Sequence, residues 1–450
     1  MILALGITWV LDGLEVTIVG AVSGVLQDPK ALHLSSEAIG AIASCYVAGA
    51  VIGALGFGWL TDRLGRRKMF YWTLAIYLLG VLLSALSWNA ASLGAFRFIT
   101  GLGIGGEYAA INSAIDELVP ARLRGRIDLI VNGSYWIGAA LGAAATIVLL
   151  DPKLLPVDLG WRLGFGIGAA LGLGILLLRR FVPESPRWLV THGFDREAEA
   201  VVGDIEHRVE EDTGAHLDEP EKSLRLNARR SFGLGLIART MVEKYRGRSA
   251  LALVLMIAQA FLYNAVFFTY GLILVRFYGV DAARTGLYLL PLAAGNFLGP
   301  LLLGHFFDTI GRRRMIAATF GVAALLLLAT ALLFALGMLS GLGQTVAWTV
   351  IFFFASAASG SAYLTASEIF PLETRALAIA VFYAAGTAIG GILAPALFGL
   401  LIATNSRWAL FAGYALASVL MIGASVMELL YGIDAEGKSL EAISDPLSAG

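Results

Sequence analysis

Residues 58–69 read GWLTDRLGRRKM, and residues 304–315 read GHFFDTIGRRRM. The two copies share an aspartate, a glycine and two arginines, which are Asp62, Gly65, Arg66 and Arg67 in the first and Asp308, Gly311, Arg312 and Arg313 in the second. A second match follows each copy. It aligns Glu117, Pro120 and Arg124 of DELVPARLR with Glu368, Pro371 and Arg375 of SEIFPLETR. Two matches at nearly the same spacing predict a duplicated chain, and duplicated membrane halves are typical of alternating-access carriers.

The composition around these motifs is that of a membrane protein. The 450-residue chain is 58% hydrophobic and 14% charged, with a mean hydropathy of +0.78. A soluble domain carries roughly 25% charged residues, so these charges are too few to cover a soluble fold of this size. The apolar runs are about 20 residues long, which suits a hydrocarbon core roughly 30 Å thick. We therefore predict an all-α integral membrane protein.

We expect twelve membrane-spanning helices in two pseudo-symmetric six-helix bundles. The first six spans are predicted at 1–25, 37–60, 69–87, 91–115, 127–150 and 160–181. The second six are predicted at 250–275, 285–306, 315–338, 344–368, 376–402 and 407–431. This divides the chain into an N-terminal bundle (1–181), a polar loop with short helices (182–248), a C-terminal bundle (249–432) and a tail (433–450). The chain opens directly on the span-like MILALGITWV, so we expect its N-terminus to be incomplete.

Loop charge predicts the orientation. Basic clusters follow spans two, four and eight, whereas the loops after spans three and nine have no Lys or Arg. The positive-inside rule places the basic loops, the central loop and both termini in the cytoplasm. We expect the chain to lie in the cell membrane as a monomer in contact with lipid.

The repeated motif predicts a gate on the cytoplasmic face. Its glycine permits a turn with positive φ, its aspartate can accept hydrogen bonds from a neighbouring helix N-terminus, and its arginines can bind carboxylates or lipid headgroups. The predicted gate comprises Asp62, Gly65, Arg66, Arg67, Glu117, Arg124, Asp308, Gly311, Arg312, Arg313, Glu368 and Arg375. The alternative is that these are only charges that set the topology.

Four ionisable residues fall inside predicted spans of the first half, namely Asp12, Glu15, Arg97 and Glu107. Such residues are costly in lipid and are functional candidates by default. Asp12 and Glu15 are three residues apart and share a helix face, so we predict that they couple proton binding to transport together with Arg97. The alternatives are a static ion pair for this group, and a solvated position near the cytoplasmic end for Glu107.

These motifs together resemble the major facilitator superfamily, and its sugar-porter branch most closely. PESPRWL (183–189), SEIFPLETR (367–375) and GKSLEAI (437–443) are similar to signatures of that branch, and Arg97 with the glycines after it fits its span-four pattern. The resemblance covers nearly the whole chain. It departs in span one, where DGLEVTIVG looks more like the paired acids of aromatic-acid and phosphate symporters. GGEY (105–108) also resembles phosphate and metabolite symporters.

The resemblance implies a substrate site made of neutral hydrogen-bonding and aromatic groups. Residues at the matching positions are Asn132, Gln259, Asn264, Asn296 and Tyr363, and Tyr383 adds a further hydroxyl. The alternative for each amide is a hydrogen bond that holds two helices together. Spans seven, eight, ten and eleven have no interior Lys or Arg, which disfavours a multiply charged anion such as phosphate.

We therefore expect a proton-coupled symporter of a small polar metabolite, with a sugar or polyol first. The runner-up is an organic or aromatic acid symporter in which Arg97 binds the carboxylate, and a nutrient receptor on the same fold ranks below it. The sequence shows no nucleophile–base pair, metal-ligand spacing or phosphate-binding loop. We expect no enzymatic activity, no cofactor or metal, and no nucleic-acid partner at a net charge of −1.

Overall fold

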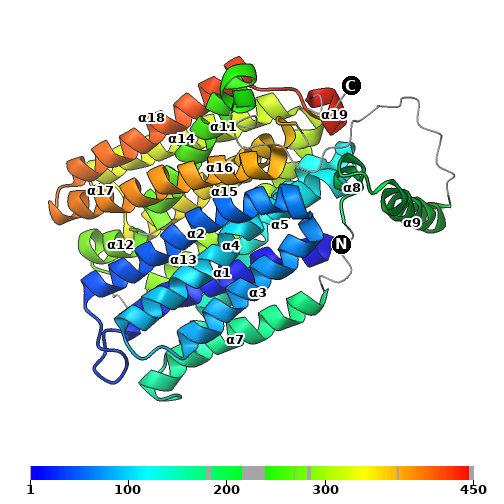
Figure 1. Ribbon diagram of the computed structural model, residues 1–450. Helices are drawn as coiled ribbons and strands as arrows, with labels where there is room; N and C mark the ends of the chain where they lie inside the picture. The colour runs from blue at the N-terminus through cyan, green and yellow to red at the C-terminus, as the bar shows by residue number, and fades with distance from the viewer. Residues whose placement is uncertain are drawn as a thin grey trace.

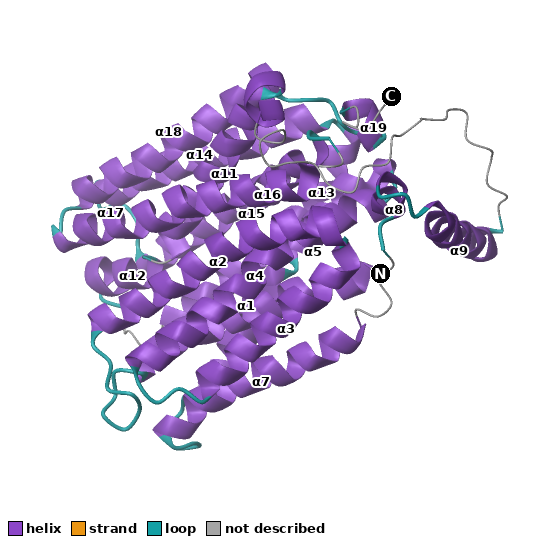
Figure 2. Ribbon diagram, viewed as in Figure 1, coloured by secondary structure: helices purple, strands orange, loops and turns teal. Residues whose placement is uncertain are grey.

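The computed structural model describes residues 2–178, 184–214, 239–267, 269–280, 285–371 and 374–444. Every regular element in these ranges is a helix (Figure 2). The long helices lie side by side, and both chain ends are found at the end of the bundle that carries the short helices α8, α9 and α19 (Figure 1). Both Gly-Arg-Arg motifs lie at this end, which we call the motif end.

The first half supplies six of the long helical segments. They are α1 (Ile2–Val25), α2 (Ser36–Leu64), α3 (Arg66–Ala85), α4 (Ala90–Leu118), the pair α5 (Arg124–Gly133) and α6 (Tyr135–Leu149), and α7 (Val157–Leu178). The second half supplies α11 (Arg246–Phe267) with α12 (Tyr270–Tyr278), α13 (Thr285–Thr309), α14 (Arg312–Ala335), α15 (Gly341–Glu368), α16 (Arg375–Gly386) with α17 (Ile392–Ala403), and α18 (Arg407–Tyr431).

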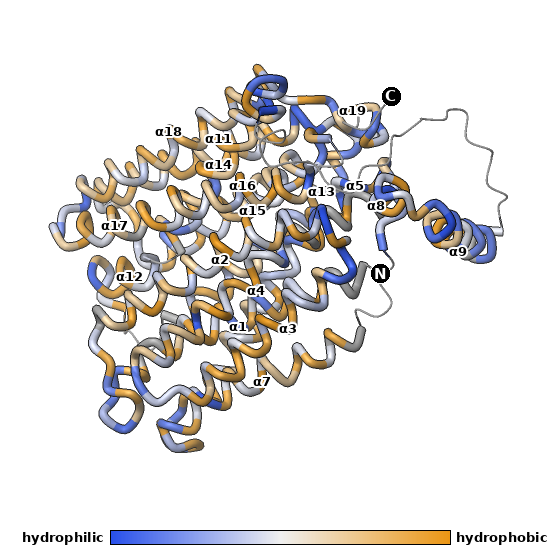
Figure 3. Tube along the Cα trace, in the orientation of Figure 1, coloured by the Kyte–Doolittle hydropathy of each residue, from blue (hydrophilic) through white to orange (hydrophobic). Residues whose placement is uncertain are grey.

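These segments fill the twelve predicted positions. Within the described residues, nine helical stretches are long and apolar enough to cross a membrane. The other three positions are taken by α1, α4 and α7, which have 24, 29 and 22 residues. Hydrophobic residues run along the bundle and hydrophilic ones gather toward its two ends (Figure 3).

Three predicted spans are interrupted rather than continuous. Span 127–150 breaks at Ser134, span 250–275 breaks between α11 and α12, and span 376–402 contains a π-helical turn at Thr387–Gly391. At the first break the Ser134 hydroxyl donates to the Gly6 carbonyl of α1 (3.0 Å). Hydropathy alone does not reveal such breaks, since the residues on both sides stay apolar. Interrupted helices beside a central site are a feature of membrane carriers.

Each bundle is held by close helix contacts. Gly101 and Gly105 of α4 lie directly against backbone of α2 at Tyr46 and Ala50, so that a Cβ on either glycine would collide with a carbonyl. Small residues that permit such approach replace the hydrophobic effect as the source of helix association in lipid. Between the bundles, α5 packs on α13 and α2 packs on α16, and the second pair lies side by side in Figure 1.

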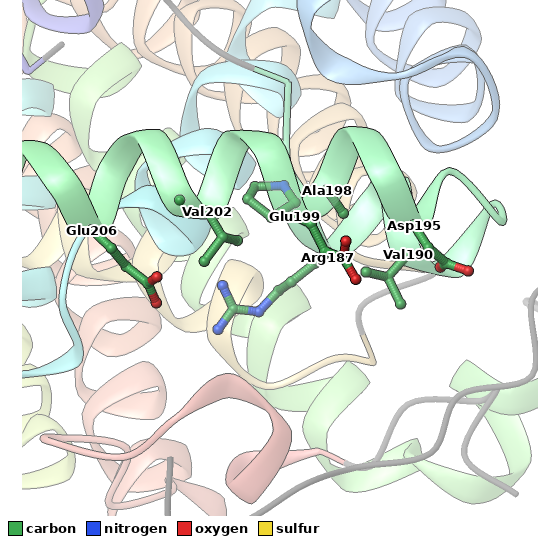
Figure 4. A pocket seen from close by; sticks show the side chains of 9 residues that line it. Arg187, Val190, Asp195, Ala198, Glu199, Val202 and Glu206 are labelled. Carbon is green, nitrogen blue, oxygen red and sulfur yellow. The ribbon is translucent and has the colours of Figure 1, made fainter. Parts of the chain in front are cut away.

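Short helices cover the motif end. They include α8 (Pro186–Thr191) and α9 (Asp195–Thr213) between the halves, and α19 (Leu440–Ile443) in the tail. An open groove of about 560 Å³ lies along α8 and α9, with Val190, Ala198 and Val202 on its apolar wall and acidic residues beside them (Figure 4). The predicted polar loop therefore contains helices where the structure describes it. Residues 215–238 of that loop and 445–450 of the tail lie outside the described ranges.

Candidate functional site

Arg97 of α4 is buried against the acids of α1. Its guanidinium forms a salt bridge with Glu15, and each of the two residues is only 2% exposed. The same group lies over the rings of Tyr46 (4.5 Å) and Phe165 (5.8 Å). The sequence grouped Asp12, Glu15 and Arg97 without indicating which acid pairs with the guanidinium; within the described contacts the pair is made by Glu15.

Asp12 has a different partner. Its Oδ2 accepts a hydrogen bond from the Tyr108 hydroxyl at 2.6 Å, while its buried Oδ1 has no hydrogen-bond partner among the described residues. The residue is 2% exposed. The cluster of Asp12, Glu15 and Arg97 thus places two carboxyl groups beside one guanidinium, and that guanidinium is already engaged.

An aromatic cluster adjoins Asp12 and crosses the interface between the bundles. Tyr108 stacks on Tyr383 of α16, with ring centroids 4.9 Å apart and an interplanar angle of 23°, and on Tyr363 of α15 at 6.2 Å and 19°. Trp9 of α1 meets Tyr108 edge-on at 4.6 Å. We call Trp9, Tyr108, Tyr363 and Tyr383 the interface cluster. Two of its rings come from each half of the chain.

Glu107, which precedes Tyr108, is 1% exposed. The expectation that it could be a solvated residue near the end of its span is therefore wrong. Its helix, α4, is packed on both α2 and α3.

The predicted amides lie inside the chain but bond mostly to protein groups. Gln259 accepts from the Ser359 hydroxyl (2.8 Å), and Asn296, which is fully buried, accepts from the Tyr263 hydroxyl (2.6 Å). Asn264 donates to the Ala260 carbonyl of its own helix (2.6 Å). Asn132 donates to the Asn112 side chain (3.4 Å). The bonds of Gln259, Asn296 and Asn132 join two helices and agree with the helix-linking alternative, whereas that of Asn264 stays within α11. Tyr263 also stacks on Trp136 of the other bundle (6.1 Å).

The two motif aspartates cap helices of the opposite bundle. Asp308 of α13 accepts from the backbone N–H groups of Gly125 (3.1 Å) and Arg126 (2.8 Å) at the start of α5. Asp62 of α2 accepts from the Leu377 N–H (3.0 Å) at the start of α16. The expected hydrogen bonds to a neighbouring helix N-terminus are therefore confirmed, and they obey the predicted internal symmetry.

Charged side chains reinforce these caps. Glu368 of α15 pairs with Arg312 (3.1 Å) in its own bundle and with Arg124 (3.2 Å) in the other, and all three are almost fully buried. Arg312 also pairs with Asp308 (2.7 Å). Arg313 donates to the Leu429 carbonyl, and Arg375 donates to that of Phe370 (3.3 Å). The side chain of Glu117 lies outside the part of the chain that the structure describes.

The motif glycines adopt the backbone that the pattern predicted. Gly65 has φ = 93° and Gly311 has φ = 114°, which side chains with a Cβ rarely adopt. A carboxylate fills the space beside each one. Glu184 accepts from the N–H groups of Arg66 (2.9 Å) and Arg67 (3.2 Å), and Glu436 accepts from that of Arg312 (3.2 Å).

Several residues of this site were missed by sequence reasoning. Glu184 and Glu436 lie outside the spans, and their capping role depends on the folded loop and tail. Tyr108 lies in the GGEY stretch (105–108), but that stretch does not indicate a bond to an acid of another helix. Trp9 gave no separate signal in an apolar span. Within the described ranges, no group of three His, Cys, Asp or Glu residues could hold a metal ion.

Known proteins resemble the chain over almost its whole length. Residues 11–444 match the family described as sugar (and other) transporters. A myo-inositol transporter of Schizosaccharomyces pombe is 31% identical, covering 99% of this chain and 81% of the relative. The niacin transporter NiaP of Acinetobacter baylyi is 28% identical over 97% of this chain and 94% of its own.

Solved structures agree on the fold. The proton:xylose symporter XylE, of the major facilitator superfamily, bound to 6-bromo-6-deoxy-D-glucose, matches with a TM-score of 0.78 at 19% identity, covering 98% of each chain. The partially occluded inward open conformation of XylE from E. coli gives a TM-score of 0.68 over 97% of this chain and 98% of that one.

Proposed function

This chain belongs to the sugar (and other) transporter family of multi-pass membrane proteins, and from that premise we propose that it is a proton-coupled symporter of a small neutral, hydroxyl-rich metabolite. It is a transporter and not an enzyme. A sugar or polyol is the proposed substrate, and alternating access of the two bundles is the proposed mechanism.

The observation that supports proton coupling is that the two acids of α1 have different partners. Glu15 is neutralised by Arg97, whereas Asp12 is enclosed and forms no ion pair with a cation in the part of the chain that the structure describes. An intramembrane carboxylate without a counter-ion is costly, which makes it a natural group for binding and releasing a proton. In this proposal Asp12 carries the proton, and Glu15 and Arg97 hold the two helices that surround it. Glu107 is proposed as a secondary proton-coupling residue because it is a buried acid on the same helix as Arg97.

The neutral side chains at the predicted substrate positions support a hydroxylated substrate. Gln259, Asn264 and Asn296 are borne by α11 and α13, Tyr363 and Tyr383 by α15 and α16, and Asn132 by α5 of the first half. Amides and phenols can exchange their protein hydrogen bonds for those of substrate hydroxyls. The relatives that transport inositol and glucose support the same class, at 31% and 26% identity.

The carboxylate-symporter alternative is less well supported. It requires Arg97 to bind the substrate, but Arg97 is enclosed, is already paired with Glu15, and contacts the rings of Tyr46 and Phe165. A substrate carboxylate would have to displace Glu15 and leave that acid buried and unpaired, which is unfavourable. Niacin, the substrate named for one relative, is a useful probe of this alternative.

We assign the motif contacts to a gate. Asp62, Asp308, Arg124 and Glu368 link the two bundles at the motif end, so separating the bundles there requires these contacts to break. The positive charges of the motif end favour its placement in the cytoplasm. In this proposal the carrier is closed toward the cytoplasm when these contacts are formed.

A counterflow screen tests the proposed function. Purified protein in liposomes preloaded with unlabelled myo-inositol, glucose, xylose or niacin is given the same labelled compound outside. We expect counterflow of a sugar or polyol, and accumulation when a proton gradient is imposed. Transport of niacin alone would support the carboxylate alternative, and sugar accumulation that ignores the proton gradient would reject proton coupling.

A further inference from the structure

Tyr108 touches both the proposed proton site and the interface between the bundles. Its hydroxyl donates to Asp12 Oδ2 (2.6 Å), and its ring stacks on Tyr383 and Tyr363 of the second half. Among the described residues, no other side chain is recorded as a hydrogen-bond donor to Asp12. One side chain therefore connects an acid of α1 with two helices of the opposite bundle.

The stack lies between Asp12 and the motif-end gate. Along α4, Tyr108 comes eleven residues after Arg97, which is about 16 Å closer to the motif end. Tyr383 is reached eight residues after α16 begins at the motif end with Arg375. The interface cluster thus closes the space between the bundles on the motif-end side of the acids.

We propose that Tyr108 is the positioning residue that transmits the protonation state of Asp12 to the inter-bundle contact. This inference rests on the proposed proton-coupled function and adds how the proton changes the state of the carrier. When Asp12 is ionised, the phenol donates to a carboxylate and its ring is held against Tyr383. When Asp12 binds a proton, the stack is released and the bundles can separate at the motif end.

The chemistry needs a proton and no other reactant. A proton supplied by the aqueous phase as hydronium adds to a carboxylate oxygen of Asp12 and leaves water behind, while Tyr108 keeps its own phenolic proton. Hydrogen bonds to an ionised acceptor are shorter and roughly twice as strong as those between neutral groups. Neutralising Asp12 therefore removes much of the force that orients the Tyr108 ring, without breaking any covalent bond.

Other groups near Asp12 are less suited to this role. Eight ionisable residues interact electrostatically with Asp12, and they come from α1, α2, α3, α4, α6, α15 and α16. They are Glu15, Arg97, Tyr46, Tyr77, Tyr108, Tyr135, Tyr363 and Tyr383. Arg97 and Glu15 are committed to each other. Tyr363 and Tyr383 contact the stack, but it is Tyr108 that also bonds to the carboxyl group.

Tyr108→Phe tests the inference because it removes the hydroxyl and keeps the ring. The assay compares myo-inositol counterflow, which needs no gradient, with accumulation driven by about one pH unit, which can support roughly ten-fold enrichment at one proton per substrate. We expect counterflow to persist within about two-fold, accumulation to fall to equilibrium, and the pH dependence of counterflow to flatten. Tyr77→Phe is the matched control. Its buried hydroxyl has no hydrogen-bond partner among the described residues and its ring lies on α3, so accumulation should be retained.

A double variant provides a second readout. If Tyr108 acts through Asp12, Tyr108→Phe combined with Asp12→Asn should transport like Asp12→Asn alone, because coupled residues are not additive. Additive losses would overturn the inference, as would Tyr108→Phe with the accumulation and pH profile of the unmodified protein. If the unmodified protein shows counterflow but no proton-driven accumulation, the proposed coupling fails as a whole. Accumulation by both the unmodified protein and Tyr108→Phe would reject the role of Tyr108 alone.

Discussion

Arg97 on α4 is paired with Glu15 on α1, whereas Asp12, one turn earlier on the same helix, bonds to Tyr108. The two acids of α1 therefore differ in their partners. A carboxylate and a guanidinium that neutralise each other in a closed environment form a structural unit. No ion pair joins Asp12 to a cation among the described residues, which is why we propose that Asp12 binds and releases the proton.

Breaking that unit from one side should be strongly destabilising. Glu15→Gln leaves Arg97 charged, enclosed and unpaired, and loss of one partner from a buried pair costs about 3–5 kcal/mol. We expect a clearly lower melting temperature in detergent. Replacing both residues, as Glu15→Gln with Arg97→Met, should recover most of the loss.

The control for this stability measurement is an exposed ion pair. Asp158 and Arg162 pair at 3.1 Å near the start of α7, with Asp158 51% exposed. Asp158→Asn should change stability by less than about 1 kcal/mol. Equal melting temperatures for Glu15→Gln and Asp158→Asn would mean that the Arg97 pair is not a structural unit.

Asp12→Asn should separate exchange from accumulation. The amide keeps the size of the side chain and an acceptor for Tyr108, but it cannot bind and release a proton. We expect counterflow of myo-inositol to continue, while accumulation driven by about one pH unit falls from roughly ten-fold to none. Asp158→Asn, the same chemical change at an exposed site, should accumulate normally. Undiminished accumulation by Asp12→Asn would remove Asp12 from the proton pathway.

The spans, the duplication and the motif contacts could be predicted because their signals are local and repeated. Each six-helix half needs a residue with positive φ at the turn that carries D-x-x-G-R-R. Gly65 and Gly311 fill this position with similar φ angles. The prediction of helices in the polar loop between the halves likewise follows from composition. These features need no knowledge of which helix lies opposite.

The partners of Arg97 and Tyr108 could not be predicted in the same way. Asp12 and Glu15 are both on the α1 face near α4, and their separation along the chain does not say which one the guanidinium reaches. A tyrosine in an apolar span has the same sequence signature whether it packs or bonds to an acid. For the amides the position was predicted but the partner was not. Asn296 matches a family position, yet its side chain accepts a hydrogen bond from Tyr263.

Arg124→Ala should favour opening at the motif end. It removes the hydrogen-bonded charge pair with Glu368 that crosses between the bundles (3.2 Å), and hydrogen bonds to charged groups contribute about 1.5–3 kcal/mol. A loss near 1.4 kcal/mol raises the open population about ten-fold. We would measure it by maleimide labelling of Ala380→Cys in a Cys45→Ala background, since Ala380 lies against Gly58 of the other bundle and is 1% exposed.

The matched control for the gate is Arg126→Ala. Arg126 is two residues away and exposed, and its contribution to the gate is its backbone N–H bond to Asp308, which alanine retains. Labelling of Ala380→Cys should stay slow in this background. Equal labelling rates of Ala380→Cys in the Arg124→Ala and Arg126→Ala backgrounds would mean that the motif charges set the topology and do not form a gate.

Acidification should loosen the tail from α8. Glu441 of α19 pairs with Arg187 of α8 at 2.5 Å. Burial raises the pKa of Glu441, but the hydrogen bond and charge of Arg187 outweigh it, and the pKa lies below its ordinary value of 4.5. A carboxyl group whose pKa is lower in the folded state stabilises that state above its unfolded pKa, and the contribution is lost as pH falls through the folded pKa. Both side chains are about 30% exposed, so the effect is small, at most about 1 kcal/mol.

Hydrogen exchange of residues 439–444, corrected for the intrinsic rate, should show protection at pH 6 that declines by pH 3.5. Glu441→Gln should show the weaker protection at both pH values, and a variant that matches the unmodified protein throughout would mean that the Arg187 pair does not hold the tail.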